Sequence, residues 1–283
     1  MELPIGMILD LLEEELNKKI GDYIMAIVGS ILGDIAGSQY EFRRPKDLDW
    51  NTCELFMNNC HFTDDTVMTL AAKLAIKNNK SFADSYRELG RKYPNTGYGE
   101  RFDTWLFSDN EKAYNSFGNG SAMRCSYIGE YFNCQSKVIE WATKSAECTH
   151  NHPEGIKGAV VTAMCVYMAR TGATKPDIFR YVKQLYPKED YRYSIEHRLD
   201  EYRSVYRWDV SCQGSVPVAI RCFLESENYE SFLRNVFSLK CDMDTLCAIG
   251  GGIAEEFYKG TGFDNEKLLR RYLDDRLYKI VRM

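Results

Sequence analysis

The stretch FTDDTVMTLAAKLAI, residues 62–76, decides the fold class of this protein. After two aspartates, its apolar residues recur every three or four positions, which is the spacing of one face of an α-helix. Val67, Leu70, Ala71 and Leu74 share that face. The spacing therefore predicts an amphipathic helix over residues 66–76, with two acidic residues just before it.

The same helical periodicity returns along the chain. It is seen in residues 138–145, and a C-terminal amphipathic helix is predicted from the spacing of Leu268, Leu269, Tyr272, Leu273, Leu277 and Ile280. No pair of alternating, strand-like runs joined by a two-residue glycine turn is present. The sequence therefore predicts an all-α fold.

Length and composition indicate an ordinary globular protein. The chain has 283 residues, of which 45% are hydrophobic and 27% charged, and its formal net charge is −5. Nonspecific nucleic-acid binding needs a basic surface that displaces counterions, so we expect no nucleic-acid partner. The longest apolar runs have about ten residues, whereas a membrane span needs roughly 20. We expect no membrane association.

The cysteines favour a reducing compartment. All ten are single, and no C-x-x-C pair is present, so neither a zinc ribbon nor a thioredoxin-type site is supported. We expect reduced thiols and a cytoplasmic protein. The N-terminus has no secretory pattern. Residues 1–23 are expected to form a helical extension that packs on the core or binds a partner, ahead of one domain over residues 24–283.

Two acidic helix starts carry the strongest chemical signal. Thr63-Asp64-Asp65 opens one apolar helix, and Asp242-Met243-Asp244-Thr245 opens another. Either could simply cap a helix N-terminus. A cap needs only one acceptor, however, and each start offers two carboxylates. If the two starts met, their four carboxylates would repel unless cations joined them, and such hard oxygen ligands suit magnesium or manganese.

Three further segments are rich in glycine or histidine. Gly33-Asp34-Ile35-Ala36-Gly37-Ser38-Gln39-Tyr40-Glu41 ends an apolar helix with small residues that allow close packing. Gly118-Asn119-Gly120-Ser121 lets backbone amides approach a ligand. His150 and His152 are two residues apart, so on a helix they could not share a metal.

Taken in order, these segments resemble the ADP-ribosylglycohydrolase family, from about Ile24 to the C-terminus. The resemblance implies a compact orthogonal multi-helix domain with a dinuclear metal cleft holding two Mg²⁺, or Mn²⁺. It implies an ADP-ribosylated protein or another ADP-ribose conjugate as substrate. Carried over residue by residue, it assigns the metal ligands Thr63, Asp64, Asp65, Asp242, Asp244 and Thr245, the catalytic carboxylates Glu41 and Asp65, and the substrate-binding residues Gly97, Tyr98, Gly99, Gly118, Asn119, Gly120, Ser121 and His150.

Two positions depart from the family pattern. Members usually carry Gly before the second motif and Ser or Thr between its aspartates, whereas this chain has Cys241 and Met243. The ligand positions are intact, so the departures bear on pocket shape and substrate choice. The family's reaction is the hydrolysis of an N- or O-glycosidic bond at C1 of a ribose, through an oxocarbenium-like transition state.

Two other functions remain open from the sequence. A helical metal-dependent phosphohydrolase often carries a His-Asp doublet, and none of the four histidines is followed by aspartate. A noncatalytic member of the same fold has no reason to retain every ligand position. Which ADP-ribosyl linkage is cut, to arginine, serine, an acetyl group or a polymer, is not determined by these motifs.

Overall fold

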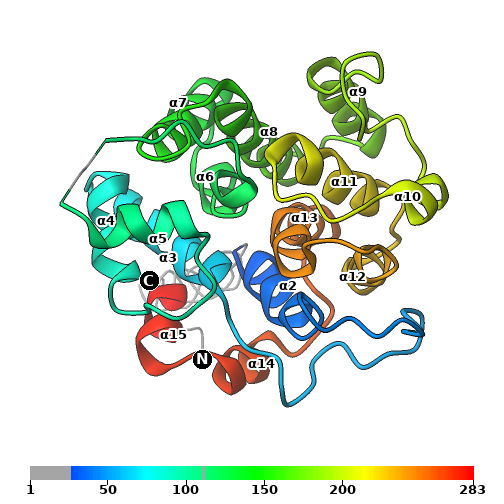
Figure 1. Cartoon of the computed structure of the whole chain (residues 1–283), viewed down its shortest axis with the longest axis horizontal. Coiled ribbons are helices and arrows are strands. Elements are labelled where there is room, and N and C mark those ends of the chain that lie inside the picture. The colour runs from blue at the N-terminus through cyan, green and yellow to red at the C-terminus, as the bar shows by residue number, and fades with distance from the viewer. Residues whose placement is uncertain (1–26, 110–111) are drawn as a thin grey trace, which may run out of the picture.

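The computed structural model describes residues 27–109 and 112–283. These residues form fourteen α-helices, one short 3₁₀ helix and no strand, which confirms the all-α prediction (Figure 1). The expected N-terminal extension, residues 1–23, lies outside them. The helices are α2 (Val28–Ser38), α3 (Asp64–Lys77), α4 (Phe82–Gly90), α5 (Glu100–Phe107), η1 (Asn119–Ser121), α6 (Ser126–Tyr131), α7 (Gln135–Glu147), α8 (Pro153–Arg170), α9 (Lys175–Leu185), α10 (Leu199–Val205), α11 (Cys212–Leu224), α12 (Tyr229–Phe237), α13 (Met243–Tyr258), α14 (Asn265–Tyr272) and α15 (Asp275–Arg282).

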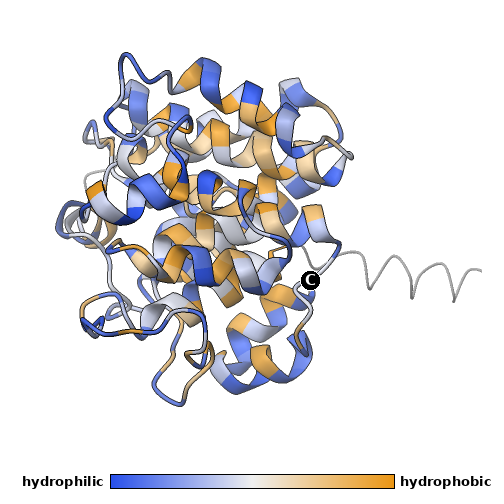
Figure 2. Ribbon diagram, turned by 90° about the vertical axis from the view of Figure 1, so that its right-hand side faces the viewer, coloured by the Kyte–Doolittle hydropathy of each residue, from blue (hydrophilic) through white to orange (hydrophobic). Residues whose placement is uncertain are grey.

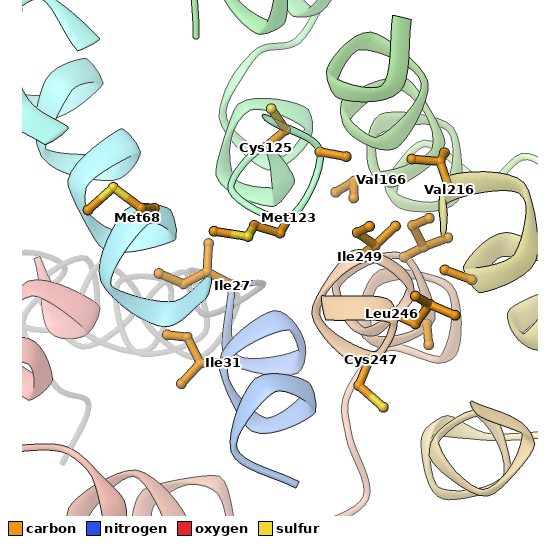
Figure 3. Packing of buried hydrophobic residues seen from close by; sticks show 14 of the residues in the cluster. Ile27, Ile31, Met68, Met123, Cys125, Val166, Val216, Leu246, Cys247 and Ile249 are labelled. Carbon is orange, nitrogen blue, oxygen red and sulfur yellow. The ribbon is translucent and has the colours of Figure 1, made fainter. Parts of the chain in front are cut away.

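Helices α2 and α13 form the centre of the molecule. They pack against each other, and α3, α6, α8, α11 and α12 surround them (Figure 1). Every residue of α2 is buried, as expected for a helix whose residues are mostly apolar, and the buried residues include Asp34. Apolar positions are concentrated in the middle of the molecule (Figure 2). Leu246 and Ile249 extend from α13 toward the helices that carry Val166 and Val216 (Figure 3).

Glycines allow the two central helices to touch through their backbones. Gly29, Gly33 and Gly37 are spaced four residues apart, so they lie on one face of α2. A Cβ atom on Gly33 would lie 2.3 Å from the carbonyl oxygen of Cys247, and one on Gly37 would lie 2.4 Å from Cα of Asp244. This contact places the end of α2 directly against the start of α13.

This backbone contact predicts that a glycine-to-alanine substitution in α2 destabilises the protein, although helix propensity alone predicts stabilisation. In an isolated helix, replacing glycine by alanine stabilises by about 1 kcal/mol. Gly33→Ala should instead lower the free energy of unfolding by about 1–3 kcal/mol, because the methyl group would overlap the backbone of α13. Thermal unfolding measures the effect. An unchanged or higher melting temperature would mean that α2 and α13 are not in backbone contact.

The structure corrects the prediction of a single C-terminal helix. The segment forms two helices, α14 and α15, separated at Leu273 and Asp274. The Asp274 carboxylate accepts hydrogen bonds from the backbone N–H groups of Arg276 and Leu277, both at 2.9 Å. An aspartate that caps a new helix in this way competes with continuation of the preceding one. Leu277 and Ile280 are still buried, as the periodicity predicts.

Two further predictions can be compared with the structure. All ten cysteines are free thiols, which agrees with the expected absence of a disulfide framework. Among the described helices, none is both long enough and apolar enough to span a lipid bilayer.

Candidate metal centre and cleft

The N-terminus of α3 is capped by an aspartate from another helix. Asp34, which is buried in α2, accepts hydrogen bonds from the backbone N–H groups of Thr63, at 2.9 Å, and Thr66, at 3.1 Å. The hydroxyl groups of the same two threonines also donate to Asp34. Two of the orphan amides of this helix start, those of Thr63 and Thr66, are therefore satisfied from α2, and the amide of Asp64 donates to the carbonyl oxygen of Thr96.

This arrangement leaves the carboxylates of the first acidic motif available. The Thr63 hydroxyl is the N-cap acceptor for the N–H of Asp65, so capping does not require either aspartate of the motif. Oδ1 of Asp65 is buried and has no hydrogen-bond partner. A buried carboxylate oxygen without a donor is expected to have another kind of ligand, because leaving it unsatisfied is unfavourable.

The two acidic motifs meet in space although 180 residues separate them, as the sequence predicts. The Thr245 hydroxyl donates to Oδ2 of Asp65 across 3.2 Å. Asp242, the N-cap residue of α13, makes no side-chain cap but accepts a hydrogen bond from Nδ2 of Asn119 at 2.7 Å. Asp244 lies one residue inside the helix and is buried. Oδ1 of Asp244 accepts the backbone N–H of Thr245 at 2.8 Å, whereas Asp242 accepts no N-terminal amide of α13.

Carboxylate oxygens gather here in two overlapping groups. Asp34, Asp65 and Asp244 form one, and Glu41, Asp242 and Asp244 form the other, with the atoms of each group within 4.8 Å of one another. None of the ion pairs between described residues involves these side chains. The cluster is therefore a buried concentration of negative charge that no cationic side chain in the described ranges pairs with.

The pKa values of the cluster show the electrostatic consequence. Burial, followed by repulsion from neighbouring carboxylates, raises the pKa of Asp64, Asp65 and Asp244 well above the ordinary value. Burial and the charge of Asp242 raise the pKa of Glu41 to about 7. Groups packed this closely must either hold protons or share bound cations.

The carboxylates line one part of a cleft with a volume of about 460 Å³. This is the size range of small-ligand sites. Its lining includes the glycine segments predicted from the sequence, namely Gly97, Gly99, Gly118, Asn119 and Gly120, together with His150, Glu41, Asp64, Asp65, Asp242, Asp244 and Thr245. Gly97 has a φ of +102°, and a Cβ atom there would lie 3.1 Å from Oδ1 of Asp64. A larger residue would therefore crowd the first acidic motif.

Three predicted site residues do not line the cleft. Thr63 lies behind the carboxylates, where its hydroxyl donates to Asp34 across 2.7 Å. Ser121 is fully buried and donates to the carbonyl oxygen of Gly155 at 2.8 Å. The Tyr98 ring packs against Phe102. The structure places these three side chains as supports of the cleft wall. His152 caps α8 through its ring, away from the acidic cluster.

Several residues of the site were not identified from the sequence, and one of them, Asp34, lies behind the residues that line the cleft. Asp34 is the clearest omission, and its signal was a charged residue inside an otherwise apolar helix. Phe42 and Trp208 stack at 5.8 Å between ring centroids and both line the cleft, with 79% and 44% of their surface exposed. Their pairing has no signature in the sequence, because Trp208 lies in a loop far along the chain.

The comparisons with known proteins agree with this site. Residues 17–263 match the family model described as ADP-ribosylglycohydrolase. The human protein named ADP-ribosylhydrolase ARH3 is 26% identical over 306 residues, covering 82% of this chain and 84% of its own length. A mimivirus protein named putative ADP-ribosyl glycohydrolase L543 is 24% identical, covering 83% of this chain and 86% of its own length.

The fold comparison leads to the same group of proteins. A solved structure titled "ADP-ribosylglycohydrolase-related protein complex" superposes with a TM-score of 0.69, covering 92% of this chain and 95% of that one, at 19% identity. At that identity the likeness concerns the fold alone, but the family model spans most of the chain and includes both acidic motifs. With its two acidic helix starts joined beside a glycine-lined cleft, this chain belongs to the ADP-ribosylglycohydrolase family.

Proposed function

We propose that this protein hydrolyses the glycosidic bond between ADP-ribose and a protein side chain, or a related ADP-ribose conjugate. The observation that carries the proposal is the pair of acidic helix starts, which meet as an unbalanced carboxylate cluster at a ligand-sized cleft. Family membership supports the substrate class. The ten free cysteines are in keeping with a cytoplasmic setting for this activity.

The donor set fits magnesium or manganese. All the available side-chain ligands are oxygens, and Oδ1 of Asp65 is buried without a hydrogen-bond partner. Asp64, Asp65, Asp242 and Asp244 would hold the ions, with the hydroxyl of Thr245 beside them. Asp34 already accepts hydrogen bonds at both oxygens, so we assign it the role of orienting the first motif. Thr63 has the same supporting role, and its sequence assignment as a direct ligand stays a prediction.

The reaction divides between the ions and the protein. When bound, divalent ions supply Lewis-acid polarisation and a lowered pKa for a coordinated water. The protein side chains orient and shield the substrate. Glu41 is half-buried on the cleft wall, near Asp242 and Asp244, where its carboxylate can exchange a proton with the reacting groups. Asp65 is the second carboxylate proposed for this role.

The rest of the cleft suits the ADP-ribose part of the substrate. We assign the backbones of Gly97 and Gly99 to the diphosphate and the turn from Gly118 to Gly120 to the ribose and adenine side, with His150. Glycines allow backbone amides to approach a phosphate or sugar closely. The aromatic pair of Phe42 and Trp208 lies on the part of the wall that adjoins Glu41.

An assay of released products tests the proposal. The protein should release ADP-ribose from a panel of arginine- and serine-modified proteins, O-acetyl-ADP-ribose and polymeric ADP-ribose, and EDTA should abolish release until Mg²⁺ or Mn²⁺ is restored. The panel also identifies the linkage. Full activity in EDTA would contradict the metal centre. Release of inorganic phosphate from nucleotides, without ADP-ribose release, would indicate a phosphohydrolase instead. Calorimetric metal binding without any turnover would indicate a noncatalytic member.

A further inference from the structure

A buried arginine, Arg124, lines the cleft and has no acidic partner in the part of the chain that the structure describes. Only 1% of the surface of Arg124 is exposed, and its guanidinium group stacks over the Tyr86 ring at 4.2 Å from the ring centroid. Its Nη2 group donates to the carbonyl oxygen of Ser145 at 2.8 Å and to the Thr149 hydroxyl at 2.9 Å. Burying a cation that only neutral acceptors hydrogen-bond is unfavourable, so we expect its position to have a function.

The Thr149 hydroxyl determines the direction of the next hydrogen bond. Its oxygen is fully buried, accepts from Arg124, and lies 2.8 Å from Nδ1 of His150. A hydroxyl group has one proton to donate. Among the described residues, the other groups that this hydroxyl contacts are Nδ1 of His150 and the Cys148 thiol. A thiol sulfur is a weak acceptor and an imidazole nitrogen is a strong one, so the Thr149 proton is donated to Nδ1. Nδ1 must then be unprotonated, and the ring proton is on Nε2.

The Nε2 atom is the one directed at the ligand turn. A Cβ atom on Gly120 would lie 3.4 Å from Nε2 of His150, and one on Gly118 would lie 3.6 Å from it. His150 and both glycines line the cleft. An N–H group at Nε2 therefore faces the position where the backbone of residues 118–120 is open to a bound molecule.

The surroundings keep this ring neutral. Burial lowers the pKa of His150 well below its ordinary value, and the positive charges of Arg124 and then Arg101 lower it further. The Tyr114 ring packs beside the imidazole at 5.9 Å between centroids. A second proton at Nδ1 would also break the hydrogen bond from Thr149.

We propose that Arg124 is a positioning residue that acts through Thr149 to hold His150 as the neutral Nε2–H tautomer, which donates to an acceptor atom of a ligand at the Gly118–Gly120 turn. The choice of ADP-ribose as that ligand rests on the proposed function. The order of the hydrogen bonds, from Arg124 to Thr149 to His150, is independent of the proposed function. The two parts can therefore succeed or fail separately.

Nitrogen NMR of the imidazole tests the tautomer without any ligand. In the parent protein, the His150 ring should give a pyrrole-type signal for Nε2 and a pyridine-type signal for Nδ1 at neutral pH. Thr149→Val, which has the shape of threonine but no hydroxyl, should shift these signals toward a mixture of tautomers, and Thr149→Ser should restore the parent pattern. A protonated Nδ1 in the parent, or an unchanged pattern in Thr149→Val, would overturn the proposal.

Ligand affinity provides a second, independent readout. Calorimetry with ADP-ribose should show binding that is about threefold to tenfold weaker for Thr149→Val, the usual effect of one net hydrogen bond, with recovery in Thr149→Ser. His150→Gln places an amide N–H near the position of Nε2, whereas His150→Asn places one near Nδ1. The His150→Gln variant should therefore bind ADP-ribose more tightly than the His150→Asn variant. The reverse order would also overturn the proposal. A parent protein with the expected tautomer that fails to bind ADP-ribose would instead refute the proposed function.

Discussion

Asp242→Ala and Asp244→Ala should each reduce release of ADP-ribose by more than 100-fold. Removing a group that merely orients a metal ligand typically reduces metal affinity or activity by about 10- to 100-fold, and loss of a charged ligand should exceed that. Asp64→Ala and Asp65→Ala should behave in the same way. Activity measured at saturating Mg²⁺, together with calorimetric metal affinity, checks the prediction.

Threonine substitutions provide the comparison within the same site. Thr63→Ala and Thr245→Ala should lose less, about 10- to 100-fold, because neither side chain carries a charge that balances a cation. Thr63 also lies behind the carboxylates, where its hydroxyl contacts Asp34. Asp47→Asn, at an exposed position, is a matched surface control and should leave activity unchanged. An Asp242→Ala variant as active as the parent would exclude the metal centre.

Although substitutions in the carboxylate cluster should reduce activity, they should increase the stability of the protein when no metal is bound. Asp65 has a raised pKa in the folded state, so its contribution to stability is present at low pH and is lost as the pH rises through that raised pKa. At neutral pH, Asp65→Asn should therefore raise the melting temperature of the EDTA-treated protein, by roughly 2–4 °C for each 1 kcal/mol gained. With Mg²⁺ the parent should have the higher melting temperature of the two, since only the parent gains stability from binding the ion. A variant less stable than the parent in EDTA would contradict the repulsion inferred for the cluster.

Glu41→Gln should reduce turnover by about 10²- to 10⁴-fold while affinity for ADP-ribose and Mg²⁺ stays near that of the parent. The amide has the shape of the carboxylate but cannot accept a proton. The position supports this role, because Glu41 follows the last residues of α2, lines the cleft, and lies with Asp242 and Asp244 in one group of carboxylates. Ligand affinity and the single-turnover rate are the two measurements required.

The two measurements separate three roles for Glu41. A lower single-turnover rate with intact binding identifies it as the group that transfers the proton. An unchanged rate would assign proton transfer to Asp65 or to a metal-bound water. Weaker binding with a proportional loss of rate would make Glu41 a substrate-holding residue. Glu54→Gln, the same exchange at an exposed position, is the control and should match the parent in both measurements.

The capping role of Asp34 could not be predicted from the sequence. The segment around it was recognised as a closely packed helix end, and the glycine contacts of α2 confirm that interpretation. Asp34 itself was not assigned a role, because the amides it caps belong to Thr63 and Thr66 on a different helix. Capping was predicted from residues adjacent in sequence, and a cap supplied across the fold leaves no such local pattern.

The stacked pair of Phe42 and Trp208 was missed for a related reason. Neither ring belongs to a periodic apolar pattern, and both remain partly exposed, so nothing local distinguishes them from scattered surface residues. Their position on the cleft wall depends on where the loops before α3 and before α11 lie in the fold. The division of the C-terminal segment at Asp274 was likewise decided by a side-chain cap that periodicity does not register.

The sequence by itself determined the helical class and the two acidic helix starts. Both follow from spacing within a single helix, where 3.6 residues per turn and the orphan amides of the first turn relate residues only a few positions apart. That these starts share one site was a prediction from their spare carboxylates, and only the tertiary structure shows the contact that joins them. Residues 180 positions apart meet there because Gly29, Gly33 and Gly37 let the backbone of α2 rest on α13. That contact sets Asp34 beside Asp65 and Asp244, and their shared burial joins separate carboxylates into one cluster whose pKa values are raised.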